Sequence, residues 1–73
     1  MAQYNGHRSW NAWNVSLWLN NDEALYRRAR GLAERHGVAR GARLLAQELA
    51  GQRTPDGGRY NPTTVREAMR GIL

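Results

Sequence analysis

The sequence predicts an all-α fold: one compact domain of four short helices, with a small turn or hairpin between the third helix and the fourth. Three observations predict this class. Apolar residues recur at spacings of three and four through most of the chain. Helix-capping residues separate these segments, and Gly and Pro gather in one stretch at residues 54–60. A chain of 73 residues forms a single domain, so we assign residues 1–73 to it.

The first helix is expected over residues 10–19. Residues 1–8 lack periodicity and are expected to form an irregular arm, after which Ser9 is a good N-cap. At 100° per residue, one stripe of the helix gathers Trp10, Trp13, Asn14, Leu17 and Trp18. The chain has no Phe to fill its core, so we expect the tryptophans to be core residues. Base stacking by exposed tryptophans in a basic protein is the alternative.

Asn14 lies within this apolar stripe. A buried amide without hydrogen-bond partners costs about 1–3 kcal/mol. Asn14 is therefore expected to hold backbone groups of another segment, either the N-terminal arm or the turn at 54–60.

The second helix is expected to begin at Asn20, because Asn20 and Glu23 have the spacing of a capping box. It runs to about His36, and Gly37 follows its end. The inward stripe of this helix is Leu25, Ala29, Leu32 and His36. The third helix is expected over residues 38–50, and its stripe is Val38, Ala42, Leu45 and Leu49. Gly41 weakens that helix by about 1 kcal/mol relative to Ala.

The Asp-Gly and Gly-Gly pairs after Pro55 predict a tight turn, or a two-residue hairpin with short strands at 53–54 and 59–60. Asn61 as cap and Pro62 as first residue then start a fourth helix over 62–71. The residues expected to face the core are Val65, Ala68, Met69 and Ile72. Thr63, Arg66 and Arg70 share the opposite face.

The charge of the chain indicates an anionic partner. All eleven basic residues are Arg and the formal net charge is +5, which is high for so small a domain. Nucleic acid and an acidic protein surface are the two partner classes that fit. The codon usage of a GC-rich genome is the alternative explanation for the absence of Lys.

Catalysis is not expected. The chain has no Cys, its two histidines lack metal-ligand spacing, and neither Ser9 nor Ser16 has a recognisable nucleophile context. We therefore expect no enzymatic activity, cofactor or metal site. The N-terminus has no apolar signal region and no window approaches the roughly 20 apolar residues of a membrane span. A cytoplasmic location without a membrane partner is expected.

Residues 4–26, YNGHRSWNAWNVSLWLNNDEALY, resemble a motif in small proteins of bacteriophages and plasmids. The usual form of that motif is YNG, a short gap, WNV-x-LW and an ND-E-x-LY ending. The resemblance implies a mobile-element origin, and hence the cytoplasm of a host bacterium, but it implies no chemistry. Small phage proteins without enzymatic features often block host defences, and anti-CRISPR proteins are of this size.

Residues 42–73 are similar to the helix-turn-helix segment of large serine recombinases, in which an LL-x-x-L helix, a TP-x-GG-x-W turn and a TV-x-x-x-L helix follow one another. Here Tyr60 stands in place of the Trp, and Met69 in place of the last aliphatic residue. The resemblance implies a helix-turn-helix-like second half that contacts DNA. Recombination itself is not expected, because the serine catalytic domain is absent.

We therefore expect a non-enzymatic phage or mobile-element protein that binds nucleic acid, or a host nucleoprotein complex, through an Arg-rich helical face. In a helix-turn-helix, Thr63 and Arg66 would meet base edges. The full set of candidate binding residues is Arg53, Arg59, Thr63, Arg66 and Arg70, with Arg27, Arg28 and Arg30 of the second helix. The alternative function is an anti-CRISPR-like inhibitor of a host defence complex that acts by protein–protein contacts alone. Target identity, base preference and oligomeric state stay open.

Overall fold

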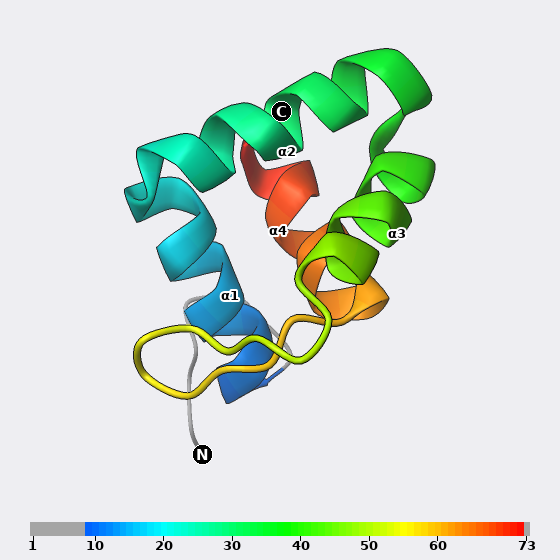
Figure 1. Cartoon of the computed structure of the whole chain (residues 1–73). Helices are drawn as coiled ribbons and strands as arrows, with labels where there is room; N and C mark the ends of the chain where they lie inside the picture. The colour runs from blue at the N-terminus through cyan, green and yellow to red at the C-terminus, as the bar shows by residue number, and fades with distance from the viewer. Residues whose placement is uncertain (1–8, 73) are drawn as a thin grey trace.

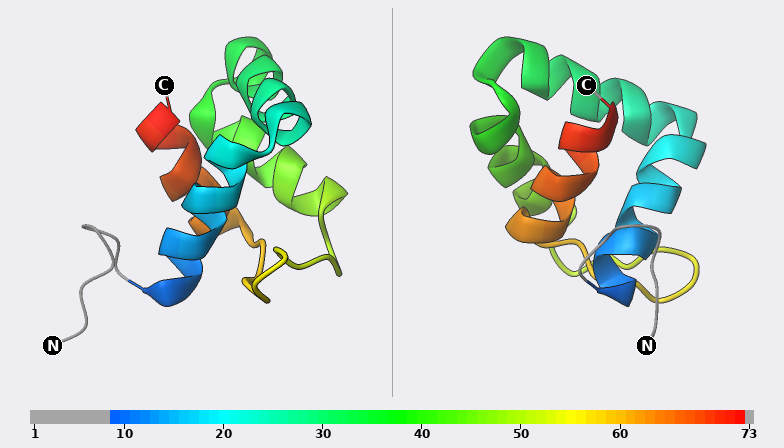
Figure 2. Two further views of the ribbon diagram at one scale, coloured as in Figure 1. Left: turned by 90° about the vertical axis from the view of Figure 1, so that its left-hand side faces the viewer. Right: turned by 180° about the vertical axis from the view of Figure 1, so that it is seen from behind.

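The computed structural model describes residues 9–72, whose four helices are α1 (Trp10–Asn21), α2 (Glu23–His36), α3 (Val38–Glu48) and α4 (Pro62–Ile72). α4 lies between α1 and α3, and α2 spans one end of the molecule (Figure 1). α1 and α4 run side by side, and both begin at the opposite end, near the hairpin that precedes α4 (Figure 2). The predicted all-α class and small single domain are confirmed.

One hydrophobic core draws on all four helices. Each helix supplies apolar residues at spacings of three and four, which lie on one face and meet in the centre. Burying a side chain such as Leu or Val contributes about 1.5–3 kcal/mol. The most deeply buried residues of this core cluster are Val15, Leu19, Ala29, Ala42, Leu45, Val65, Ala68 and Met69.

α1 buries a different face from the one expected. Trp10 is 39% exposed, while Trp13 and Trp18 are only half-buried, so the prediction that the tryptophans form the core is wrong. The helix instead turns inward its smaller apolar residues, which include Val15 and Leu19. α1 is apolar around most of its circumference, so periodicity alone does not define the face that the other helices cover.

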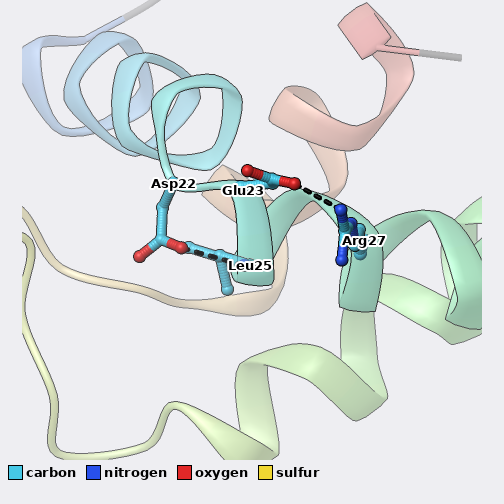
Figure 3. Close-up of polar contacts among 4 residues, drawn as sticks. All are labelled: Asp22, Glu23, Leu25 and Arg27. Atoms are coloured by element: carbon cyan, nitrogen blue, oxygen red, sulfur yellow. Dashed lines mark hydrogen bonds and ion pairs between the residues drawn. The ribbon is translucent and has the colours of Figure 1, made fainter.

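The boundary between α1 and α2 lies two residues later than predicted. Asp22, not Asn20, is the N-cap of α2, and its Oδ1 accepts the Leu25 N–H at 3.1 Å (Figure 3). The Asn20 side chain instead donates to the Ser16 carbonyl at 2.8 Å, inside α1. The expected capping box of Asn20 and Glu23 is therefore wrong, because α1 continues through Asn20 and the extended backbone of Asp22 separates the two helices.

Two glycines shape the junction between α2 and α3. Gly37 joins the helices at a positive φ of 82°, as its predicted place after α2 requires. Gly41 is buried, and a Cβ built there would lie 3.0 Å from the backbone carbonyl of Leu32, so the glycine allows α3 to approach α2 closely. His36 is exposed, contrary to its predicted place in the inward stripe, and Ala33 is buried instead. α3 ends two residues earlier than expected.

The connection between α3 and α4 contains a tight hairpin loop. The Gly57 N–H donates to the Thr54 carbonyl and the Thr54 N–H donates to the Gly58 carbonyl, both at 2.9 Å. With Gly57 at a φ of 93°, this is a three-residue loop closed by a left-handed glycine. The predicted tight turn is confirmed, and its alternative, a two-residue hairpin, is wrong. The predicted short strands reduce to a bridge between Arg53 and Arg59.

α4 begins at Pro62, as predicted, and Asn61 caps it. The Asn61 Oδ1 accepts the Thr64 N–H at 2.9 Å, and the Thr64 Oγ1 accepts the Asn61 N–H at 3.1 Å. This exchange resembles a capping box with Thr in the third position. The predicted inward residues Val65 and Met69 are fully buried.

The arm at 1–8 and the side chain of Ile72 lie outside the described residues. Across residues 9–72, we find no helix with the length and apolar character needed to cross a membrane.

Candidate functional site

A polar cluster holds the hairpin against α1. The Asn14 Nδ2 donates to the Asp56 carboxylate at 3.0 Å, and the Asn14 Oδ1 accepts the Thr54 hydroxyl. The Trp18 Nε1–H donates to the same Asp56 oxygen at 2.8 Å, and the Gly58 N–H donates to the Thr54 Oγ1 at 2.8 Å. The alternation of Trp and Asn along α1 thus serves, in part, to build the face on which the hairpin docks.

Asn14 is fully buried, which confirms its predicted burial, and its partner segment is the turn at 54–60. Its partners are the side chains of Asp56 and Thr54, however, and not the backbone groups expected. A Cβ at Gly58 would lie 2.6 Å from the Asn14 Oδ1, so the cluster closes only around a glycine.

Two side chains of this cluster donate hydrogen bonds to the Asp56 carboxylate. The hydrogen bond from Asn14, and then the one from Trp18, lower the pKa of the Asp56 carboxyl below its ordinary value, against a smaller opposing effect of burial. These two donors favour the ionised form. The carboxylate of the hairpin is thus directed toward α1 by its hydrogen bonds.

Arg53 and Arg59 lie opposite each other at the base of the hairpin. Both are exposed, and within residues 9–72 neither forms an ion pair. The main chain of Arg59 is held between two helices, because its N–H donates to the Asn11 Oδ1 at 3.0 Å and its carbonyl accepts the Thr64 hydroxyl at 3.2 Å. A hollow beside the pair is lined also by Gly51, Gln52 and Tyr60. The structure therefore brings these two predicted residues together near the first turns of α1 and α4.

Tyr60 forms one wall of this hollow and also packs against the hydrophobic core. Burial, and to a smaller extent the negative charge of Asp22, raise the pKa of its phenol. A phenol is neutral at pH 7 even at its ordinary pKa of about 10, so Tyr60 adds no negative charge to the hollow.

The exposed face of α4 carries Thr63, Arg66 and Arg70, as predicted. Together with the half-buried Glu67 they line a hollow of about 170 Å³. Neither arginine has a carboxylate partner in the part of the chain that the structure describes. Glu67 reduces the positive charge of this face without removing it.

The three predicted arginines of α2 are all matched with carboxylates: the pairs are Arg27–Glu23, Arg28–Glu48 and Arg30–Glu34. Figure 3 shows the first of these, one turn apart on the helix. Arg28 joins α2 to α3 through two nitrogens, an arrangement that raises the pKa of Arg28 and lowers that of Glu48. Within residues 9–72, the predicted set thus divides into arginines of α2 that form ion pairs and arginines of the hairpin and α4 that do not.

Two surface features lie outside the set of candidate binding residues that the sequence predicted. Arg35, Arg40 and Arg43 are also exposed and without an ion pair among the described residues. Arg40 and Arg43 are three residues apart, so they lie on one side of α3, and this spacing could have predicted a second arginine face. The second feature is the exposure of Trp10, for which the signal was a competing inward set of smaller apolar residues in the same helix.

No group of side chains suited to a metal ion is found where the structure describes the chain: no three residues of the His, Cys, Asp and Glu types gather there. His36 is exposed at the end of α2, and His7 lies outside the described residues.

Comparisons with known proteins give one match. A family model described as "Family of unknown function (DUF7249)" matches residues 1–73. No curated protein and no solved structure matches the chain.

Proposed function

The chain belongs to the DUF7249 family, whose description assigns no function, and from its own surface we propose that it binds nucleic acid, alone or within a nucleoprotein complex, through α4 and the hairpin base. One observation carries this proposal. The four arginines Arg53, Arg59, Arg66 and Arg70 have no carboxylate partner among residues 9–72, whereas each predicted arginine of α2 has one. A cation without an internal partner is available to an anionic ligand.

The arrangement of α4 supports a duplex as the ligand. Pro62 and Thr63, at its start, are exposed, and a helix N-terminus favours nearby phosphates. Arg66 and Arg70 follow one turn apart, about 6 Å along the axis. Arg is the commonest reader of guanine in the major groove and a strong phosphate ligand. In this assignment Thr63 and Arg66 face bases, and Arg70 faces the backbone.

The similarity of residues 42–73 to a recombinase helix-turn-helix segment supports the same assignment. The resemblance of residues 4–26 to phage and plasmid proteins supports a mobile-element setting, in which the target is a nucleic acid or nucleoprotein complex of the bacterial host. No step of this proposal requires catalysis.

Fluorescence anisotropy with a labelled duplex of mixed sequence tests the proposal, using Arg66→Gln with Arg70→Gln. A matched control is Arg40→Gln with Arg43→Gln, which removes the same charge from an exposed face of α3. Both variants should fold, since surface changes stay within about 0.5 kcal/mol. The α4 variant should bind more weakly and flatten the log–log salt dependence by roughly 0.9 for each phosphate that it no longer binds. Equal losses in the two variants would show that net charge, not α4, attracts the duplex.

A second candidate function is inhibition of a host defence complex by protein–protein contacts alone, as in anti-CRISPR proteins. The observation that favours it is the outer side of α1, where Trp10 is exposed and Trp13 and Leu17 are half-buried on a helix without a charged residue. Trp is enriched among residues that dominate protein interfaces. A pull-down from host lysate that survives nuclease and is lost in Trp10→Ser, while duplex binding is absent, would favour this function over the first.

A further inference from the structure

The hairpin base holds two like charges in an unfavourable arrangement. Arg53 and Arg59 are bridge partners, and the Arg59 N–H donates to Asn11, not across the hairpin. The pair therefore occupies a non-hydrogen-bonded position, in which opposite Cα atoms lie about 4.5 Å apart and their side chains are close. Like charges directly opposite each other destabilise a hairpin. The fold gains nothing visible from two arginines at these positions.

Among residues 9–72, no carboxylate forms an ion pair with either arginine to offset this repulsion. Asp56, the acidic residue of the same hairpin, accepts hydrogen bonds from Asn14 and Trp18 on α1. The Arg59 main chain is anchored on both sides, by its N–H to Asn11 and by its carbonyl to Thr64, so its Cα stays opposite that of Arg53. The first turns of α1 and α4 lie nearby, and helix N-termini carry partial positive charge. A local arrangement that costs stability and is nonetheless held in place is expected at functional sites.

The hollow beside the arginine pair is large enough to hold one chemical group of a larger ligand, but not a whole small molecule. Its volume is about 280 Å³, with Gly51, Gln52 and Tyr60 completing its lining. This lies below the roughly 300–1,000 Å³ of pockets that enclose a whole small molecule. Its charged groups are two guanidinium ions, which bind phosphate oxygens through paired N–H donors. One phosphate would offer both arginines acceptors and would offset their repulsion.

We propose that Arg53, Arg59 and the adjoining hollow form a subsite for one phosphate group, supplied by the backbone of the nucleic acid. The nucleic-acid source rests on the proposed function, whereas the phosphate chemistry rests on the arginine pair alone. Free inorganic phosphate has the same chemistry, and an experiment with two arms separates the two sources.

The first arm is an NMR titration with inorganic phosphate at constant ionic strength, with chloride and acetate as reference anions. Saturable shifts are expected at the Arg53 and Arg59 Nε–H signals and at the amides of residues 51–53 and 59–60. They should be abolished in Arg59→Gln and kept in Arg40→Gln, an exposed arginine of α3 without an ion pair among residues 9–72. Shifts that do not saturate, that acetate reproduces, or that Arg59→Gln retains would overturn the subsite.

Folding of the variant is checked by its melting temperature. The contacts that anchor Arg59 use its main chain, so Arg59→Gln keeps them. In chloride its melting temperature should be equal to or above that of the wild type, because the repulsion is gone. In phosphate at matched ionic strength, the wild type and Arg40→Gln should gain more than Arg59→Gln does. An equal gain in all three proteins would be a general salt effect and would count against the subsite.

The second arm measures the affinity of a 12-base-pair duplex by anisotropy. Arg53→Gln with Arg59→Gln should weaken binding and flatten the salt slope by roughly 0.9, the value for one phosphate. Duplex binding that needs Arg66 and Arg70 but is unchanged in this variant would leave the proposed function standing and overturn the subsite. Specific phosphate shifts without any duplex binding would support the phosphate chemistry and overturn the nucleic-acid source.

Discussion

Gly58 and Gly31 show how differently a single methyl group acts at two positions of this chain. A Cβ at Gly58 would lie 2.6 Å from the Asn14 Oδ1 and 3.0 Å from the Thr54 Oγ1, whereas a Cβ at Gly31 would meet nothing within 4 Å. We predict that Gly58→Ala lowers the free energy of unfolding by about 1–3 kcal/mol, as overpacking does. Gly31→Ala should raise it by up to about 1 kcal/mol, the helix-propensity difference.

Urea unfolding followed by circular dichroism measures both glycine variants. A Gly58→Ala protein as stable as the wild type would mean that Asn14 and Thr54 do not meet beneath the hairpin.

Asp56 gives the docked hairpin a pH dependence. Hydrogen bonds from Asn14 and Trp18 lower its pKa in the folded protein. A group with a depressed folded pKa contributes stability above its unfolded pKa of about 3.9, and the contribution is lost as the pH falls through the folded value. We predict that the Trp18 Nε1–H NMR signal shifts with a midpoint below the ordinary carboxyl pKa of about 3.9.

The control for this titration is Asp56→Asn, which removes the ionisable group and should abolish the shift of the Trp18 signal. Glu48 also has a lowered pKa, caused by its hydrogen bonds with Arg28. Glu48 lies on α3 at the contact with α2, however, and not in the cluster around Asp56. A Trp18 signal that titrates at or above the ordinary carboxyl value would contradict the hydrogen bonds assigned to Asp56.

At the scale of the element, α1 has one side that packs in the core and one side that faces outward. Leu19 is fully buried in the core, whereas Leu17 is half-buried on the outer side with Trp10 and Trp13. We predict that Leu19→Ala costs about 2–5 kcal/mol and that Leu17→Ala, the same chemical change, costs less. The reason is that the first leaves a cavity among packed helices and the second does not. Chemical denaturation compares the two, and an equal cost would place the outer side of α1 in the core after all.

At the scale of the whole molecule, repulsion between arginines opposes folding. Three arginines are paired with carboxylates among residues 9–72, and the net charge of the chain is +5. The molecule measures 38 × 22 × 19 Å. The screening length is about 30 Å at 0.01 M salt and about 8 Å at 0.15 M, so only dilute salt lets charges interact across the molecule. We predict that the melting temperature rises between these two NaCl concentrations.

A smaller rise is expected in Arg66→Gln with Arg70→Gln, which removes two cations that form no ion pair among residues 9–72. Exposed ion pairs contribute only about 0–1 kcal/mol each, so their screening should not reverse the trend. A melting temperature that falls with added NaCl would show that the three ion pairs outweigh the repulsion.

Most helix caps, the position of the turn and most inward stripes of this protein are determined by the sequence alone. Ser9, Gly37 and the Asn61–Pro62 pair start or end helices where expected, and Gly57 turns the chain within the predicted stretch. Capping and turn interactions join residues a few positions apart, so the local sequence is enough to predict them. The same locality explains why the exposed face of α4, with Arg66 and Arg70, was predicted correctly.

Only the tertiary structure decided which side of α1 is buried and which arginines are paired. Asn14 meets Asp56 and Thr54 across 42 and 40 residues of chain, and Arg28 meets Glu48 across 20. A helix that is apolar nearly all round can bury either of two faces, and the choice is made by the elements that pack on it. Contacts between distant residues depend on how α1, α4 and the hairpin come together, and the periodicity of a single helix carries no information about that arrangement.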